Sequence, residues 1–186
     1  MKPNHLASIG ARDVGSIKLD DFFASPPEAV DALCSVERFD GDIWEPACGN
    51  GAISSVLERR GYKVHSSDLV NRGYGRDRID FLMEREPWAA NIVTNPPYKL
   101  GEDFARHALT LTTGKVAFLM RLVWLEGQAR RSLFSDPRFA RVWVFSKRLP
   151  RMHRPDFQGE RTTSTIAFAW FVWDHAHSGP PNLGWI

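Results

Sequence analysis

Residues 42–51 have the sequence DIWEPACGNG, in which a short apolar segment runs directly into a turn that contains two glycines. The apolar half predicts a buried strand, and Ala52–Arg60 predicts a helix because its apolar residues recur on one face. We expect that helix to end at Gly61. Gly49 and Gly51 permit backbone conformations, and a close approach of a ligand, that a Cβ would block.

Helix and strand signals alternate on both sides of this turn. A helix is predicted from Ser25 onward, with Ser25 as its N-cap and Glu28 completing a capping box, and others over Gly101–Leu111 and Glu126–Phe134. The predicted strands are apolar runs, which indicates a parallel sheet covered on both faces. They are Asp42–Ala47, Tyr62–Ser67, Arg78–Phe81, Ala90–Thr94, Lys115–Val123, Arg141–Ser146 and Thr163–Trp173. The predicted fold class is therefore α/β, a doubly wound and mostly parallel sheet.

An acidic residue, Asp68, follows the second predicted strand. In open α/β sheets ligands bind beyond the carboxyl ends of the strands, and a carboxylate at this place accepts hydrogen bonds from the hydroxyls of a ribose. Ser54 occupies the place of the third glycine of the dinucleotide fingerprint, and the chain has no GK[ST] phosphate loop. The order of strand, glycine turn, helix, strand and Asp68 favours a nucleoside-bearing ligand without phosphates. Alone, each feature would equally fit a plain turn or a polar loop.

A second motif, Thr94-Asn95-Pro96-Pro97-Tyr98, follows the fourth predicted strand. Its two prolines fix φ, so the Asn95 side chain and the Pro96 carbonyl are held as two hydrogen-bond acceptors. A conjugated NH2 group between them would donate both hydrogens, which makes its nitrogen more nucleophilic. Tyr98 offers a flat face on which a base stacks. The alternative is a rigid loop that ends the strand, with Tyr98 as a packing residue.

Taken together, EPACGNG at 45–51, Asp68, Asp80-Phe81 and NPPY at 95–98 resemble the S-adenosylmethionine-dependent amino methyltransferases, above all the N6-adenine DNA methyltransferases. The resemblance covers roughly residues 20–174 and implies a seven-stranded doubly wound sheet, the Rossmann-like methyltransferase fold, whose last strand is antiparallel. Phe22-Phe23-x-Ser25-Pro26-Pro27 looks like the motif that closes over the cofactor carboxylate, and its place upstream is similar to the gamma arrangement.

The resemblance also implies a cofactor, S-adenosyl-L-methionine, and a set of site residues. The catalytic loop would be Asn95, Pro96, Pro97 and Tyr98. Asp68 would bind the ribose, Asp80 and Phe81 the adenine, and Glu45 with the glycine turn the methionine part. The full set of implied cofactor-binding residues is Phe23, Ser25, Pro26, Glu45, Ala47, Cys48, Gly49, Gly51, Asp68, Asp80, Phe81 and Asn95.

The expected reaction is methyl transfer to a planar exocyclic amino group, with adenine N6 in DNA as the favoured acceptor. Relatives with NPPY also methylate RNA bases and glutamine amides of proteins, so both remain alternatives. A non-catalytic cofactor-binding subunit of a methyltransferase assembly is a further alternative, against which the intact NPPY argues. No separate target-recognition domain is expected, so loops or a protein partner would supply specificity.

A basic segment follows the sixth predicted strand. Four cations fall within residues 147–154, together with one of the two prolines that limit the freedom of residues 147–157. This composition suits contacts with the phosphates of a nucleic acid. The alternative is a solvated loop whose charges aid solubility. The expected substrate-binding residues are Tyr98, Lys147, Arg148, Arg151, Arg154 and Phe157, the last as an aromatic neighbour of the target base.

Length and composition limit the other classes of protein to which the chain could belong. The chain has 186 residues, 43% of them hydrophobic and 25% charged, as in a soluble globular protein of one domain. We expect an arm at 1–19, a methyltransferase domain at 20–174 and a tail at 175–186. No apolar run suits a membrane helix, and the first residues lack the apolar core of a secretory signal. Two cysteines and six histidines form no metal-ligand set, and the expected location is the cytoplasm.

Overall fold

The structure, a computed structural model, describes residues 23–152 and 162–186. The arm expected at 1–19 therefore lies outside the described residues. Within the two described ranges, no helix is long and apolar enough to cross a membrane.

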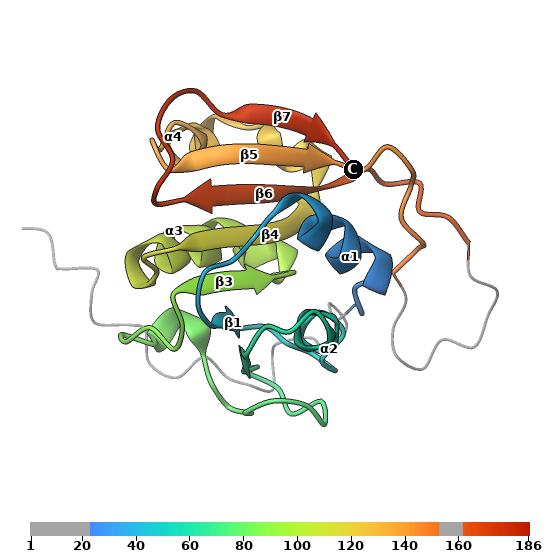
Figure 1. Cartoon of the computed structure of the whole chain (residues 1–186), viewed down its shortest axis with the longest axis vertical. Coiled ribbons are helices and arrows are strands. Elements are labelled where there is room, and N and C mark those ends of the chain that lie inside the picture. Colours follow the sequence, from blue (N-terminus) through green and yellow to red (C-terminus); the bar gives the residue numbers. More distant parts are fainter. Residues whose placement is uncertain (1–22, 153–161) are drawn as a thin grey trace, which may run out of the picture.

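The predicted α/β fold is confirmed, with a mixed sheet whose strand order is β2-β1-β3-β4-β6-β5-β7 (Figure 1). The described strands are β1 (Ile43–Glu45), β2 (Val64–Ser66), β3 (Asn91–Thr94), β4 (Lys115–Arg121), β5 (Phe139–Val144), β6 (Phe168–Asp174) and β7 (Asn182–Trp185). Neighbours pair in parallel except at β6, which is antiparallel to both β4 and β5. The carboxyl ends of β1 to β5 consequently meet at one edge of the sheet.

Two predictions about the strands were wrong. Arg78–Phe81 is not a strand, because the Asp80 carboxylate accepts the backbone N–H of Leu82 at 3.0 Å and caps the 3-10 helix η2 (Phe81–Met83). The segment 175–186, expected as a tail, contains β7, which pairs in parallel with β5. Gly184 permits this pairing, since a Cβ there would lie 2.2 Å from the Trp143 ring. The strand expected to be last is the antiparallel β6, and the sheet continues beyond it.

Helices cover both faces of the sheet. They are α1 (Pro27–Val36), α2 (Ser54–Arg59), α3 (Gly101–Leu111) and α4 (Arg131–Phe134), with the further 3-10 helices η3 (Tyr98–Leu100), η4 (Leu122–Leu125) and η5 (Gln128–Arg130). The predicted α3 is confirmed with the same bounds. The helix predicted over Glu126–Phe134 is instead divided into η5 and α4, and Gly127 before them has a φ of +107°.

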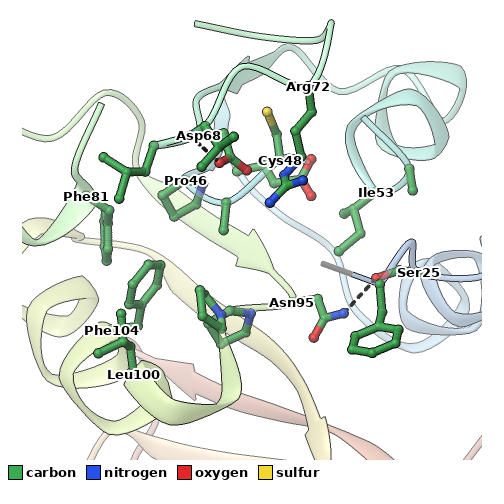
Figure 2. A pocket seen from close by; sticks show the side chains of 18 of the residues that line it. Ser25, Pro46, Cys48, Ile53, Asp68, Arg72, Phe81, Asn95, Leu100 and Phe104 are labelled. Atoms are coloured by element: carbon green, nitrogen blue, oxygen red, sulfur yellow. Dashed lines mark hydrogen bonds between the residues drawn. The ribbon is translucent and has the colours of Figure 1, made fainter. Parts of the chain in front are cut away.

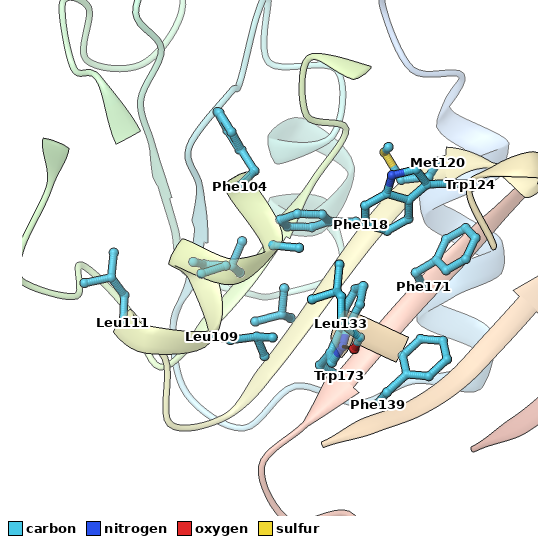
Figure 3. Close-up of a cluster of buried hydrophobic side chains, with 14 of the residues drawn as sticks. Phe104, Leu109, Leu111, Phe118, Met120, Trp124, Leu133, Phe139, Phe171 and Trp173 are labelled. Carbon is cyan, nitrogen blue, oxygen red and sulfur yellow. Dashed lines mark hydrogen bonds between the residues drawn. The ribbon is translucent and has the colours of Figure 1, made fainter. Parts of the chain in front are cut away.

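Two hydrophobic cores follow from the alternation of side chains along the central strands. Phe118 of β4 and Trp173 of β6 belong to the core beneath α3 and α4, which Figure 3 shows. Leu119 of β4 and Trp170 of β6 belong to the opposite core, beneath α1 and α2. All four side chains are fully buried. The antiparallel pair at the centre of the sheet therefore supplies both cores and fixes the position of the helices around the strand ends.

A buried carboxylate fastens α1 to the sheet. Glu37, at the C-terminus of α1, is 2% exposed and accepts hydrogen bonds from Lys115, Arg141 and Trp143. Arg141 also donates to Asp174 at 2.8 Å. Burial alone would raise the pKa of Glu37, but these hydrogen bonds hold its pKa below the ordinary value of 4.5. The charged form of Glu37 therefore stabilises the folded chain.

Replacing this carboxylate should weaken the fold and alter its response to acid. Because the folded-state pKa of Glu37 is lowered, its stabilisation is present above the unfolded-state pKa and is lost as the pH falls through the folded-state value. Glu37→Gln leaves Arg141 and Lys115 without their buried partner and should lower the free energy of unfolding at pH 7 by about 3 kcal/mol. It should also flatten the loss of stability that the wild type shows as the pH falls below about 4.5.

Urea unfolding at several pH values measures both effects. Glu28→Gln changes an exposed carboxylate on the same helix and should cost less than about 1 kcal/mol. Equal losses for the two variants would contradict a structural role of the Glu37 cluster.

Candidate functional site

A cavity of about 530 Å³ lies at the carboxyl ends of β1, β2 and β3 (Figure 2). It brings together most of the residues that the sequence singled out: Phe23, Ser25, Glu45, Ala47, Cys48, Asp68, Asp80, Phe81, Asn95, Pro96, Pro97 and Tyr98. Pro26, Gly49 and Gly51 do not line it. Two segments far apart in the sequence, the strand end at Glu45 and the loop at Asn95, therefore share one cavity.

Asp68 holds the glycine turn in shape. Its Oδ2 accepts the backbone N–H of Gly49 and its Oδ1 accepts that of Val70, both at 2.8 Å. A carboxylate has about four lone-pair sites, so Asp68 retains acceptor capacity toward the cavity that it lines. Asp68 therefore stabilises the glycine turn, in addition to the contact with a ligand that the sequence led us to expect.

The expected reason for Gly51 needs correction. Gly51 has a φ of +80°, and a Cβ there would lie 2.5 Å from the ring of Tyr74, not in the cavity. Tyr74 is anchored by a hydrogen bond of 3.0 Å from its hydroxyl to Glu58 in α2. The glycine therefore makes room for an aromatic ring that packs on the outside of the turn. Gly49 has a φ of +56°, which likewise favours glycine.

Glu45 is buried and serves the start of α2. Its Oε2 accepts the backbone N–H of Ser54 at 2.8 Å and also the Ser54 hydroxyl. Burial raises the pKa of Glu45 well above its usual range, although both hydrogen bonds act in the opposite direction. Glu45 lines the cavity with a side chain that is 1% exposed, so its first effect is to fix α2 against the glycine turn.

Asp80 and Phe81, which the resemblance assigns to the adenine of the cofactor, both line the cavity. Phe81 is only 1% exposed, because its ring packs edge-on against Trp44, with the ring centroids 5.1 Å apart, and against Phe104 at 4.8 Å. The core therefore fixes the ring, and a ligand would contact the part of it that borders the cavity (Figure 2).

Asn95 is held by Ser25 in an orientation that leaves its oxygen unpaired. Asn95 Nδ2 donates to Ser25 Oγ at 3.1 Å, across 70 residues of sequence (Figure 2). The same nitrogen contacts Met152 Sδ at 3.9 Å. Ser25 is consequently not the N-cap of α1; Pro26 takes that place, without a side-chain cap. Asn95 Oδ1 is buried and has no hydrogen-bond partner among the described residues. Buried polar atoms are nearly always paired, so this oxygen is an acceptor with unused hydrogen-bonding capacity.

Tyr98 follows in η3 and closes the cavity beside Asn95. Its hydroxyl contacts Met152 Sδ at 3.9 Å, and the guanidinium of Arg121 lies over its ring, 4.8 Å from the centroid. Burial raises the pKa of Tyr98 to about 12, although Arg121 acts in the opposite direction. The phenol is therefore neutral at physiological pH.

Some lining residues carried no signal in the sequence. Arg72 points into the cavity from the loop after β2, and Ile53 and Phe104 complete its apolar wall (Figure 2). Arg72 was missed because it is one charge among several in a polar loop. The thiol of Cys48 is buried and its pKa is raised to about 12 by that burial, which makes it a packing residue, not a nucleophile. No cluster of metal-ligating side chains occurs in the described part of the chain.

The basic segment lies at the same edge of the sheet as Asn95, after β5. Lys147, Arg148 and Arg151 are exposed there and do not line the cavity. The ends of the segment are joined by backbone hydrogen bonds between Arg151 and Thr162 and between Ser164 and Leu149. Arg154 and Phe157 lie outside the described residues.

Solved methyltransferases share this fold. A provisionally assigned RNA methyltransferase of Pyrococcus horikoshii aligns with a TM-score of 0.53 and 14% identity over 79% of this chain and 81% of its own. The modification subunit of a provisionally assigned type I restriction enzyme of Vibrio vulnificus aligns with a TM-score of 0.54 and 14% identity. That alignment covers 92% of this chain and 48% of the subunit.

The magnesium protoporphyrin IX methyltransferase of Synechocystis, solved with bound SAM, aligns with a TM-score of 0.53 and 12% identity over 81% of this chain and 79% of its own. Similarities at this level establish a common fold. No protein-family model matches the chain, and no curated protein matches it.

Adding a methyl group to Gly51 should reveal the packing of Tyr74 on the glycine turn. Gly51→Ala forces both a left-handed backbone and a collision with the ring, and we expect a loss of roughly 3 kcal/mol of stability. Gly61→Ala is the matched control, because Gly61 has a φ of +89° but nothing within 4 Å of the added Cβ, and should cost about 1 kcal/mol.

Chemical unfolding in the Tyr74→Ala background completes the double-mutant cycle. Removal of the ring should reduce the cost of Gly51→Ala to that of Gly61→Ala. A cost that does not change without Tyr74 would refute the proposed contact.

Proposed function

We propose that this protein transfers a methyl group from S-adenosylmethionine to a planar exocyclic amino group, with adenine N6 in DNA as the favoured acceptor. The observation that carries the proposal is the side chain of Asn95, which lines the cavity of about 530 Å³ and whose buried oxygen lacks a partner among the described residues. An amino group of this kind supplies the N–H donor that the oxygen lacks.

The cavity also fits the cofactor. A ligand with a ribose, an adenine and a cationic sulfonium suits a pocket with the carboxylates of Asp68 and Asp80 and the apolar wall around Ile53. Arg72 would complement a carboxylate of the ligand. The bound SAM in the Synechocystis enzyme of the same fold supports this assignment.

The residues of the loop would act on the acceptor nitrogen. Asn95 Oδ1 and the Pro96 carbonyl accept its two hydrogens, which hold the amino group in line and raise the electron density on nitrogen. The cofactor supplies an activated methyl group bonded to a positively charged sulfur. As the N–CH3 bond forms and the S–CH3 bond breaks, the sulfur keeps the electron pair and the nitrogen becomes acidic. Its proton then leaves to solvent, so no strong base is needed.

The choice of DNA rests on two supports. The NPPY loop resembles that of the N6-adenine DNA methyltransferases, and the Vibrio vulnificus modification subunit shares the fold. A duplex target base would leave the stack at a cost of a few kcal/mol and would stack on Tyr98. Exposed cations at Lys147, Arg148 and Arg151 would contact phosphates at the same edge of the sheet. A protein partner would add sequence recognition.

Removing the unpaired oxygen should abolish methyl transfer but not cofactor binding. Asn95→Ala should bind S-adenosylhomocysteine within about 3-fold of the wild type and lose methyl transfer by about 100-fold or more, since the oxygen acts mainly in the transition state. Calorimetry and transfer of a radiolabelled methyl group, followed by nucleoside analysis of DNA and RNA and by peptide analysis, measure the two effects.

Asn182→Ala, at an exposed position of β7, is the matched control and should behave as the wild type. A methylated product in RNA or in a glutamine side chain, and not in DNA, would support the proposed reaction but contradict DNA as the substrate. A wild type that binds the cofactor but methylates nothing would favour a non-catalytic subunit.

Loss of the Ser25 hydroxyl should affect turnover more than binding. Ser25→Ala frees the Asn95 amide to rotate, and we expect kcat to fall by about 10-fold, the effect of one lost hydrogen bond, with little change in KM. Ser25→Thr keeps the hydroxyl and should restore kcat. A higher KM for the cofactor with an unchanged kcat would show that Ser25 serves the cofactor and not Asn95.

A further inference from the structure

A second cavity, of about 360 Å³, shares the lining residue Tyr98 with the first. The second cavity is formed by the end of β4 and by the η4 and η5 segments that follow it. Because β3 and β4 are parallel neighbours, the loops at their carboxyl ends are adjacent, which places the second cavity next to the loop that carries Asn95.

Two arginines bring positive charge to the second cavity. Arg121 is exposed at the end of β4, lies over the Tyr98 ring and forms no ion pair with any described residue. Arg130 donates to the backbone carbonyls of Trp124, at 2.9 Å, and of Glu126. These bonds occupy two of its five N–H donors and hold the guanidinium rigidly in the wall. One carboxylate, that of Glu126, also lines the cavity, which leaves a net positive charge.

The floor of the cavity is apolar. Met120 and Trp124 are 2% and 7% exposed and belong to the core beneath α3. Val123 also lines the cavity and is 55% exposed, so it offers apolar surface to a ligand. Apolar surface with guanidinium groups at its edge is the composition that binds a base and the phosphate attached to it.

We propose that this cavity binds the nucleotide that flanks the acceptor adenine in a nucleic acid, with its phosphate on Arg121 and its base over Val123. The proposal rests on the function proposed above. A guanidinium that lies over an aromatic ring still offers the N–H groups at its edge to a phosphate, and Glu126 would accept a hydrogen bond from an exocyclic amino group of the base. A peptide substrate offers neither a phosphate nor a large planar group, so the nucleic acid is favoured.

Short single-stranded DNA that contains one adenine tests the subsite, with binding and methylation measured separately. In the presence of S-adenosylhomocysteine, Arg121→Gln should weaken DNA binding by about 10-fold and reduce the log–log salt slope by about 0.7, the value for one phosphate of a single strand. Val123→Glu places a negative charge in the lining of the cavity and should weaken binding in the same way. Methylation of free deoxyadenosine, which has no flanking nucleotide, should stay unchanged in both variants.

Matched controls separate the subsite from general charge effects. Arg131→Gln removes an exposed arginine of α4 that does not line the cavity, and Leu125→Glu adds a charge at a neighbouring exposed apolar residue that does not line it. Both should bind DNA as the wild type does, and equal thermal melting temperatures exclude misfolding. DNA binding that falls equally in variants and controls overturns the subsite.

The remaining outcomes distinguish the subsite from the proposed function. Loss of activity on free deoxyadenosine in Arg121→Gln, as large as the loss on DNA, overturns the subsite, because Arg121 would then act through Tyr98. A second outcome is that the wild type methylates no nucleic acid, although its DNA binding is weakened by the changes at Arg121 and Val123. This result supports the subsite and overturns the proposed function. A third outcome is that the protein binds no DNA but methylates a glutamine peptide equally well in the wild type and in both variants. This result overturns the subsite and the proposed function together.

Discussion

The common direction of β1, β2, β3 and β4 is the constraint on which the site depends. Parallel strands end at the same edge of a sheet, so residues that follow four separate strands are brought together there. Glu45, Asp68, Asn95 and Arg121 each lie at or just after the end of one of these strands. The antiparallel β6 completes both cores beside β4 and leaves this edge open to the loops.

The carboxylates of the site are used first by the protein itself. Asp68 accepts the backbone N–H of Gly49, Glu45 accepts that of Ser54, and Asp80 accepts that of Leu82. Each bond satisfies a donor at a turn or helix start that would otherwise be unpaired. The acidic residues of the motifs therefore shape the backbone that surrounds the cavity. The carboxylates around the cavity are thus held by hydrogen bonds within the protein. The oxygen of Asn95 differs from them because it has no partner among the described residues.

The two cavities that share Tyr98 differ in what surrounds them. The first is enclosed by the glycine turn, Asp68 and the segment at Ser25, and the second is open and carries Arg121. The hydroxyl of Tyr98 contacts Met152 Sδ, and the guanidinium of Arg121 lies over its ring. A substrate that spans both cavities would be held at its reacting group and at the unit next to it.

The sequence by itself determined most of the alternation of helices and strands, the bounds of α3, and the motif residues that line the first cavity, because apolar periodicity and the Asn95-Pro96-Pro97 turn are local properties of the chain. Tertiary contacts decided the rest. The pairing of β7 depends on the space that Gly184 leaves for Trp143, and the shape of the glycine turn depends on Tyr74 over Gly51. The atom of Asn95 that stays unpaired is decided by Ser25, 70 residues away. Contacts between residues so distant in the chain leave no periodic signal, so only the folded structure selects them.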